Sequence, residues 1–170
     1  MNRPPRSVLA TLAVLALAAA VWYWGFRPTE ADRIRERIAE LERVVSTPPA
    51  AGLMGKAETV AAFRDLLTNP VRIDSRQAPV RGIRSPDEVA AAFLAGSGAG
   101  DKVVLDISPK EILFSPDDRA TVEIAVSATL TRSGNPPRDY SGNALVEMRK
   151  SKEDDSWKFE SFEENAPARR

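Results

Sequence analysis

The sequence predicts an α+β domain in which three helices pack on a curved antiparallel sheet of four to five strands. Before Gly100, apolar residues recur at helical spacing, and from Asp101 onward they alternate with polar residues. A period of two is typical of half-buried strands, so the helices come first and the sheet follows. A long apolar segment near the N-terminus predicts one transmembrane helix ahead of this domain.

Composition limits what the protein can do. The chain has 170 residues, enough for one domain and an anchor, and its 24 basic and 24 acidic residues are interspersed and balance to zero. We therefore expect no nucleic-acid partner. The sequence contains no His and no Cys, which excludes Ser-His-Asp and Cys-His catalysis, the usual zinc sites, haem and iron–sulfur ligation, disulfides and lipoprotein acylation. We expect no cofactor.

Residues 8–26 form the predicted transmembrane anchor, after a cytoplasmic stub of residues 1–7. The segment is apolar and about 19 residues long, close to the ~20 residues that span a bilayer. Its end carries aromatic side chains where an aromatic belt would meet the lipid headgroups: Trp22, Tyr23 and Trp24.

Arg3 and Arg6 precede the anchor, so the positive-inside rule places the N-terminus in the cytoplasm. Residues 27–166 would then form a periplasmic domain on the outer side of the inner membrane, followed by a tail at 167–170. A cleavable signal peptide is an alternative, because small residues at 18–20 could be cut. Cleavage there would leave an exposed apolar terminus. A buried core helix is a further alternative, but the rest of the chain offers no apolar partner of matching size.

Three helices are expected in the domain. The first, "ADRIRERIAELERVV", follows a variant capping box of Thr29 and Asp32 and is ended by "STPPAAG". The second is "KAETVAAFRDLL", which Asn69-Pro70 ends. The third, "SPDEVAAAFLAG", has the clearest start signal, with Ser85 as N-cap, Pro86 in the first turn and Glu88 closing the box.

A short strand, "VRIDSR", and four long strands complete the prediction: "DKVVLDISPKEILF", "RATVEIAVSATLT", "YSGNALVEMRK" and "SWKFESFEE". Short turns between the long strands predict an antiparallel meander. Pro109 lacks an N–H and indicates an edge strand or a bulge. In the last strand, regular alternation puts Trp157 and Phe159 on one face and Phe162 on the other, which predicts burial on both sides.

This order of elements, with "SPDEVAAAFLAG" and "DDSWKFESFEE", resembles the nuclear transport factor 2-like superfamily over roughly residues 29–164. The resemblance implies a cone-shaped domain. Members include ketosteroid isomerase, scytalone dehydratase, polyketide cyclases and non-catalytic binding or scaffold domains, so the fold fixes no function. Scytalone dehydratase-like chemistry uses His, which is absent here. The isomerase pattern of a buried Tyr with an Asp base is not matched, since Tyr140 follows a loop. The periplasmic scaffold subunit of type IV secretion systems shares the layout of stub, spanning helix and exported cone.

Seven side chains are candidates for lining a pocket or its polar floor: Asp74, Arg76, Glu123, Tyr140, Glu147, Arg149 and Trp157. Asp74 and Arg76 lie two apart on the short strand and share a face. Glu123 and Glu147 could form a cross-strand cluster with Arg149, either as the floor of the cone with a carboxylate base or as ion pairs on a solvated outer face. Trp157 is expected in the core or at a pocket wall.

These observations favour a non-enzymatic, membrane-tethered binding or scaffold domain. Its partner would be a small apolar ligand or a protein outside the inner membrane. A homodimer through the sheet face is also expected. The alternative is an isomerase or lyase with a carboxylate base in the cone.

Overall fold

The structure is a computed structural model that describes Leu15 and residues 28–46, 53–75, 80–96, 102–132 and 134–165. The chain divides into two compact units, Met1–Asp32 and Arg33–Arg170. Among the described residues, no helix is both long enough and apolar enough to cross a membrane. The predicted anchor at 8–26, with its three aromatic residues, lies outside the described residues except for Leu15, so the anchor stays a prediction.

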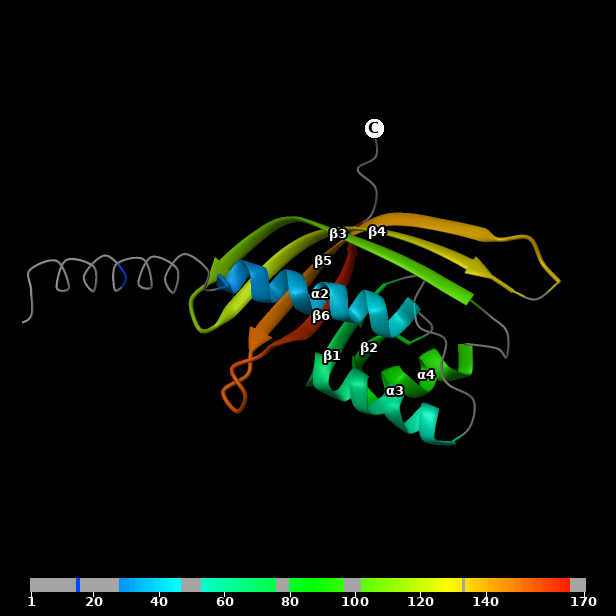
Figure 1. Ribbon diagram of the computed structural model, residues 1–170, viewed down its shortest axis with the longest axis horizontal. Helices are drawn as coiled ribbons and strands as arrows, with labels where there is room; N and C mark the ends of the chain where they lie inside the picture. Colours follow the sequence, from blue (N-terminus) through cyan, green and yellow to red (C-terminus); the bar gives the residue numbers. More distant parts are fainter. Residues whose placement is uncertain are drawn as a thin grey trace, which may run out of the picture. The chain divides into compact units, whose positions relative to one another are not determined.

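The second unit is built on a six-stranded, curved sheet with the strand order β2-β1-β6-β5-β4-β3 (Figure 1). Its strands are β1 (Leu67–Asp74), β2 (Gly82–Arg84), β3 (Lys102–Ser115), β4 (Arg119–Thr131), β5 (Arg138–Lys150) and β6 (Trp157–Asn165). Neighbouring strands are antiparallel except β1 and β6, which run parallel. The predicted meander of β3 to β6 is confirmed.

The expected count of four to five strands, all antiparallel, is wrong in one region. The second helix ends at Leu66, and β1 begins at the next residue, before the Asn69-Pro70 pair that was expected to end the helix. Residues 82–84 then add β2 at the edge beside β1. The sheet extends past β6 because Val71 and Ile73 continue the buried face of the sheet.

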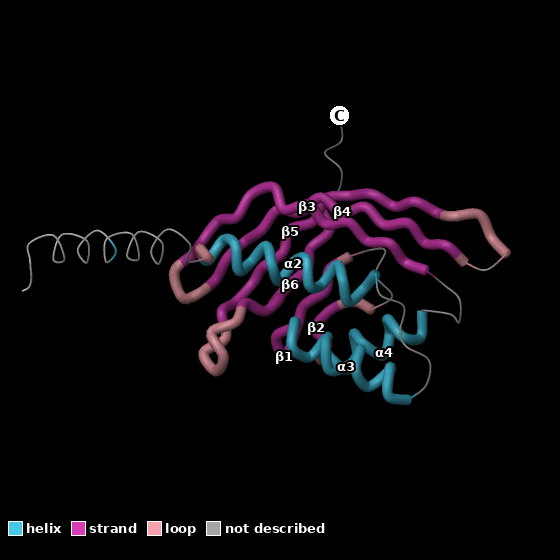
Figure 2. Tube along the Cα trace, in the orientation of Figure 1, coloured by secondary structure: helices cyan, strands magenta, loops and turns pink. Residues whose placement is uncertain are grey.

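Three helices supply the other layer: α2 (Glu30–Ser46), α3 (Leu53–Leu66) and α4 (Pro86–Gly96). Figure 2 shows helix and strand segments of this α+β arrangement in separate colours. All three helices contribute to one core cluster with the sheet, through Ile34, Phe63 and Ala90 among others. The α+β architecture with three helices is therefore as predicted.

Both predicted capping boxes are present. At α2, the Thr29 backbone N–H donates to Asp32 Oδ2 at 3.0 Å, and the Asp32 N–H donates to Thr29 Oγ1 at 3.2 Å. At α4, the Ser85 N–H donates to Glu88 Oε2 at 2.8 Å, and the Glu88 N–H donates to Ser85 Oγ at 3.3 Å. These reciprocal bonds satisfy backbone donors that a helix start leaves unpaired.

Register shifts interrupt three of the ladders, and those of β3–β4 and β5–β6 bear on the predictions. The β3–β4 register shifts between Pro109 and Glu111, and β3 is an edge strand, so both readings of Pro109 are correct. The β5–β6 register shifts at Glu147/Met148, which leaves Glu160 as an extra residue on β6. After this bulge the alternation is reversed. Phe162 therefore lies on the same face as Phe159 and stacks on it, with ring centroids 5.3 Å apart. The prediction that Phe162 faces the opposite side is wrong.

Helix α2 covers part of the open edge of β3. The Leu105 N–H donates to Ser46 Oγ at 2.9 Å, and the Ile107 N–H donates to Glu42 Oε2 at 3.2 Å. The next edge-directed position is Pro109, which has no N–H to offer. Side chains of α2 and a proline thus protect an edge that another strand could otherwise join.

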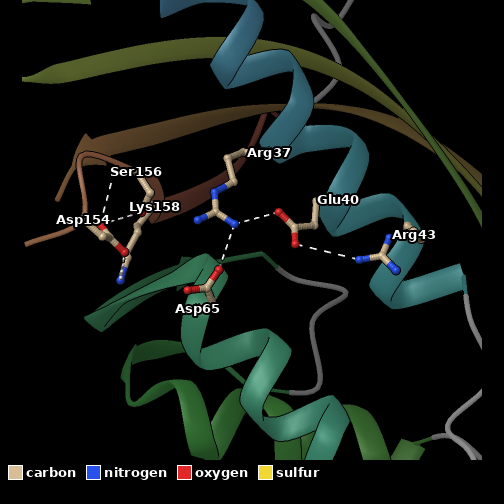
Figure 3. Close-up of polar contacts among 7 residues, drawn as sticks. All are labelled: Arg37, Glu40, Arg43, Asp65, Asp154, Ser156 and Lys158. Carbon is tan, nitrogen blue, oxygen red and sulfur yellow. Dashed lines mark hydrogen bonds and ion pairs between the residues drawn. The ribbon is translucent and has the colours of Figure 1, made fainter.

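Ion pairs fix α2 to its neighbours (Figure 3). The Arg37 guanidinium donates to Glu40 Oε2 at 2.7 Å and to Asp65 Oδ2 of α3 at 2.9 Å, as the dashed lines show. Burial of this guanidinium acts to lower its pKa, but the hydrogen bonds that it donates to Glu40 and Asp65, with their negative charges, outweigh burial, so the Arg37 pKa is raised. Arg33 reaches Asp155 in the β5–β6 turn at 3.1 Å. Single exposed pairs contribute little, so the packing beneath them carries the stability.

Candidate functional site

A cavity of about 190 Å³ lies on the inner face of the sheet, the face that packs on the helices. Its described lining comes from β4, β5, β6 and the residue after β1: Ser75, Val126, Ala128, Tyr140, Ser141, Gly142, Asn143, Ala144, Phe162, Glu163 and Glu164. Most of the lining surface is apolar. A mostly apolar lining with a few polar groups that orient the ligand is typical of small-molecule sites.

The cavity exists because the inner-face side chains of β5 become smaller along the strand. Met148 and Val146 are fully buried in the core, whereas the next inner-face positions toward the start of β5 are Ala144 and Gly142. In register, Ala144 lies opposite Ile124, and Gly142 lies opposite Val126. Losing side-chain volume at two successive inner positions leaves a hollow where the core would otherwise continue.

The bulge in β6 turns a carboxylate toward this cavity. Without the extra residue at Glu160, the alternation set by Trp157 and Phe159 would put Glu164 on the outer face. With the bulge, Glu164 lies opposite Ala144 on the inner face and lines the cavity. Ser75 Oγ donates a hydrogen bond to Glu164 Oε2 at 2.7 Å, which orients the carboxylate. Bulges commonly re-aim a side chain in this way.

Tyr140 lines both this cavity and a second hollow of about 290 Å³. The second hollow is formed at the β4–β5 hairpin by Leu130, Arg132, Asn135, Pro136, Arg138 and Tyr140. In register, Leu130 lies opposite Arg138 and Ala128 opposite Tyr140. The inner face of this hairpin therefore continues from an apolar cavity with a carboxylate to a hollow with two arginines.

Of the seven residues singled out from the sequence, Tyr140 lines the inner-face cavity. Trp157 is 3% exposed and belongs to the core, where its ring makes an edge contact with Phe114 at 6.1 Å between centroids. It also borders a hollow of about 410 Å³ between α2 and the β5–β6 turn. Asp74 is exposed on β1, on the same face as its neighbour Arg72. Arg76 lies outside the described residues.

Glu123, Glu147 and Arg149 lie on the outer face of the sheet, because their strand neighbours Val122, Val146 and Met148 are buried on the inner face. Each has a different partner: Lys110 Nζ lies 3.4 Å from Glu123 Oε1, Ser161 Oγ donates to Glu147 at 3.0 Å, and Arg149 pairs with Glu160 at 2.5 Å. The structure thus places these residues together on the solvated face but not in one cluster.

Sequence reasoning missed Ser75, Phe162, Glu164 and Arg138 as lining residues. For Phe162 and Glu164 the cause is the bulge, which reverses the face that alternation assigns. For Ser75 the cause is the parallel pairing of β1 with β6, which brings residues far apart in sequence together. A signal was available for Gly142 and Ala144, since two small residues at successive inner positions of a long strand indicate a place where packing stops.

Comparisons with known proteins identify the fold. No protein-family model matches the sequence, and no curated protein is significantly similar to it. Solved structures do match. The Kfla4162 protein of Kribbella flavida is 18% identical, with 81% of this chain and 90% of that chain covered and a TM-score of 0.64. A nuclear transport factor 2-like superfamily protein of Salmonella enterica serovar Typhimurium is 15% identical, with coverages of 79% and 89% and a TM-score of 0.59.

The fold is nuclear transport factor 2-like. A further match is a Novosphingobium aromaticivorans protein named after scytalone dehydratase, at 19% identity, coverages of 80% and 83% and a TM-score of 0.63. At these identities the likeness concerns the fold and not the activity. In a domain of this fold, the hollow on the inner face of the sheet is the candidate site.

Proposed function

We propose that this nuclear transport factor 2-like domain binds a small, mostly apolar ligand in the inner-face cavity, without catalysing a reaction. The observation that carries the proposal is the hollow that opens where Ala144 and Gly142 replace larger core residues. Its volume of about 190 Å³ is comparable with an engineered cavity of roughly 150 Å³ that binds benzene. The cavity thus suits one ring or a short alkyl chain, or the apolar part of a longer ligand.

The membrane tether is part of this proposal and rests on the sequence. An apolar segment at 8–26 with preceding arginines would hold the domain on the outer side of the inner membrane. The test is alkaline extraction of membranes, followed by protease treatment of spheroplasts. The tether predicts that the chain stays in the membrane fraction and that residues after the anchor are digested from outside. Release of an intact chain into the soluble fraction would contradict it.

Ligand binding is tested by native mass spectrometry of the full chain carried in nanodiscs. We expect an added mass that disappears on denaturation. In the variant Ala144→Leu, the added side chain fills the cavity, so the mass should be absent. The matched control is Ala91→Leu on the exposed side of α4, which should retain it. A ligand that survives Ala144→Leu would place binding elsewhere and contradict the cavity proposal.

A second candidate function, an isomerase or lyase, is favoured by one observation. Glu164 brings a carboxylate to an apolar cavity, which is the arrangement that a general base requires. A base that works near neutral pH needs a pKa close to that pH. Titration of the Glu164 carboxyl by ¹³C NMR therefore separates the two functions. Titration near pH 7 would favour catalysis, whereas titration near the usual value of about 4.3 would favour binding alone.

The proposed homodimer through the sheet face is supported by the shape of the outer face. A shallow hollow of about 430 Å³ lies there, lined mainly by small side chains such as Ser108, Ala125, Ser127 and Ser141. Small side chains allow a second sheet to approach closely. Sedimentation of the full chain in nanodiscs of one known size should give two chains per particle. The variant Ala125→Arg should give one, while a wild-type monomer would remove this proposal.

A further inference from the structure

We propose that the natural ligand is an anionic amphiphile. Its apolar body would lie in the cavity beside Ala144 and Phe162, and its anionic head would bind Arg138 at the β4–β5 hairpin. This inference rests on the proposed function, since it names the chemical class of ligand for the same site.

The two hollows are neighbours along one face of one hairpin. Tyr140 lines both, and Ala128 and Gly142 line the first. Arg138 and Ala144 lie six positions apart on β5, which corresponds to about 20 Å at ~3.3 Å per residue. A ligand can therefore place an apolar end in the cavity and a polar end at the hairpin only if it is elongated.

The guanidinium of Arg138 is available for an anion. Within the part of the chain that the structure describes, the side chain of Arg138 makes neither a hydrogen bond nor an ion pair with another residue. Its neighbours Leu130 and Tyr140 supply apolar surface beside the charge. Arg132 lines the same hollow, so two cations lie near one another. A guanidinium presents its donors as a planar fork that matches a carboxylate or a phosphate.

Charge also fixes the direction in which the ligand lies. The described charged residues that line the apolar cavity are Glu163 and Glu164, both acidic. The described charged residues of the hairpin hollow are Arg132 and Arg138, both basic. The Arg138 guanidinium therefore attracts an anionic head to the second hollow. A cationic amphiphile would be placed the other way round, with its tail among the arginines, where the lining is more polar.

The test compares four probes with the same twelve-carbon alkyl chain, which is long enough to extend from the cavity to the Arg138 side chain: dodecanoate, dodecyl phosphate, dodecan-1-ol and dodecylammonium. Calorimetric titrations use the full chain in phosphatidylcholine nanodiscs, with empty nanodiscs subtracted. We expect both anions to bind about tenfold more tightly than dodecan-1-ol, and dodecylammonium to bind no better than the alcohol. A tighter dodecyl phosphate would indicate a phosphate head such as that of a lipid, and a tighter dodecanoate would indicate a fatty acid.

Two variants locate the head. Arg138→Gln removes the charge but keeps a long polar side chain, so it should abolish the advantage of the anions and leave the binding of dodecan-1-ol unchanged. Arg72→Gln, on the outer face, should change neither. Equal or tighter binding of dodecylammonium, or an anion advantage that survives Arg138→Gln, would overturn the inference while ligand binding stands. If dodecan-1-ol and both anions fail to bind wild type at all, the proposed function itself fails.

Discussion

At the scale of one residue, Phe159 shows how the last strand closes the core. It is 1% exposed, and its ring stacks on Phe162 at an interplanar angle of 20°. It lies opposite Met148, which is also fully buried. Phe159→Ala should therefore lower the free energy of unfolding by roughly 3–5 kcal/mol, the range for large core truncations. Urea denaturation followed by circular dichroism measures this loss.

Phe114→Ala is the matched control, since the ring of Phe114 also contacts an aromatic neighbour, Trp157, but is 51% exposed. Truncating a half-exposed ring removes less buried surface, so the loss should be about 1 kcal/mol or less. Equal losses for the two variants would show that β6 does not close the core as the structure indicates.

At the scale of elements, α2 does two things: it packs on the sheet and it protects the β3 edge. Glu42→Ala would leave the Ile107 N–H without the side-chain acceptor that it has at 3.2 Å. An unpaired, half-buried donor costs about 1–3 kcal/mol. The same change opens the strand edge, so self-association should rise. Urea midpoints and concentration-dependent light scattering measure the two effects.

Glu36→Ala is the control for Glu42→Ala, because Glu36 is an exposed glutamate on the same helix. It should alter neither the urea midpoint nor the scattering. Loss of stability with Glu36→Ala, or no change with Glu42→Ala, would contradict the proposed protection of the edge.

The start of α4 depends on one side chain. Ser85 Oγ accepts the Glu88 N–H and donates to the Glu88 carboxylate at 3.2 Å. Ser85→Ala removes the cap, and the cost should be about 1 kcal/mol. Ser85→Thr keeps the hydroxyl and should restore most of it, as chemical denaturation would show. A loss of the same size with Thr would mean that the hydroxyl is not what stabilises the helix.

At the scale of the whole molecule, sequence patterns predicted the features that depend on residues close together in the chain. The capping boxes at Thr29 and Ser85, the change of period at Asp101 and the bulge at Pro109 are all readable from neighbouring residues. The parallel pairing of β1 with β6 depends on contacts between distant segments, so no local pattern announces it. The bulge at Glu160 has no local sequence signal either, and it places Phe162 and Glu164 on the face opposite to the one that regular alternation predicts. For this reason sequence reasoning missed Phe162 and Glu164 as cavity residues.

Acid should destabilise the domain, whereas a change of pH near neutrality should leave its stability unchanged. Among the described residues, four exposed carboxyls have a pKa below the ordinary range: Asp87, Glu88, Asp154 and Asp155. The pKa of Asp87 is lowered chiefly by the hydrogen bond that Arg64 donates to its carboxylate. The pKa of Asp154 is lowered chiefly by the hydrogen bond that the Ser156 hydroxyl donates. A carboxyl whose pKa is lower in the folded state contributes stability that is complete above its unfolded value of about 4 and lost as pH falls through the folded value.

The chain has no His and no Cys, so no side chain of ordinary pKa titrates between pH 6 and 8. Urea midpoints should be flat across that range and should fall below about pH 4. In wild type, the Ser156 hydroxyl donates a hydrogen bond to the charged Asp154 carboxylate at 2.8 Å. In Asp154→Asn the acceptor is an amide oxygen that does not titrate, so the urea midpoint should decrease less steeply as the pH falls. Glu153→Gln, in the same turn, is the control. A midpoint that changes between pH 6 and 8 would require a buried group of strongly shifted pKa, and Glu164 in the cavity would be the first to examine.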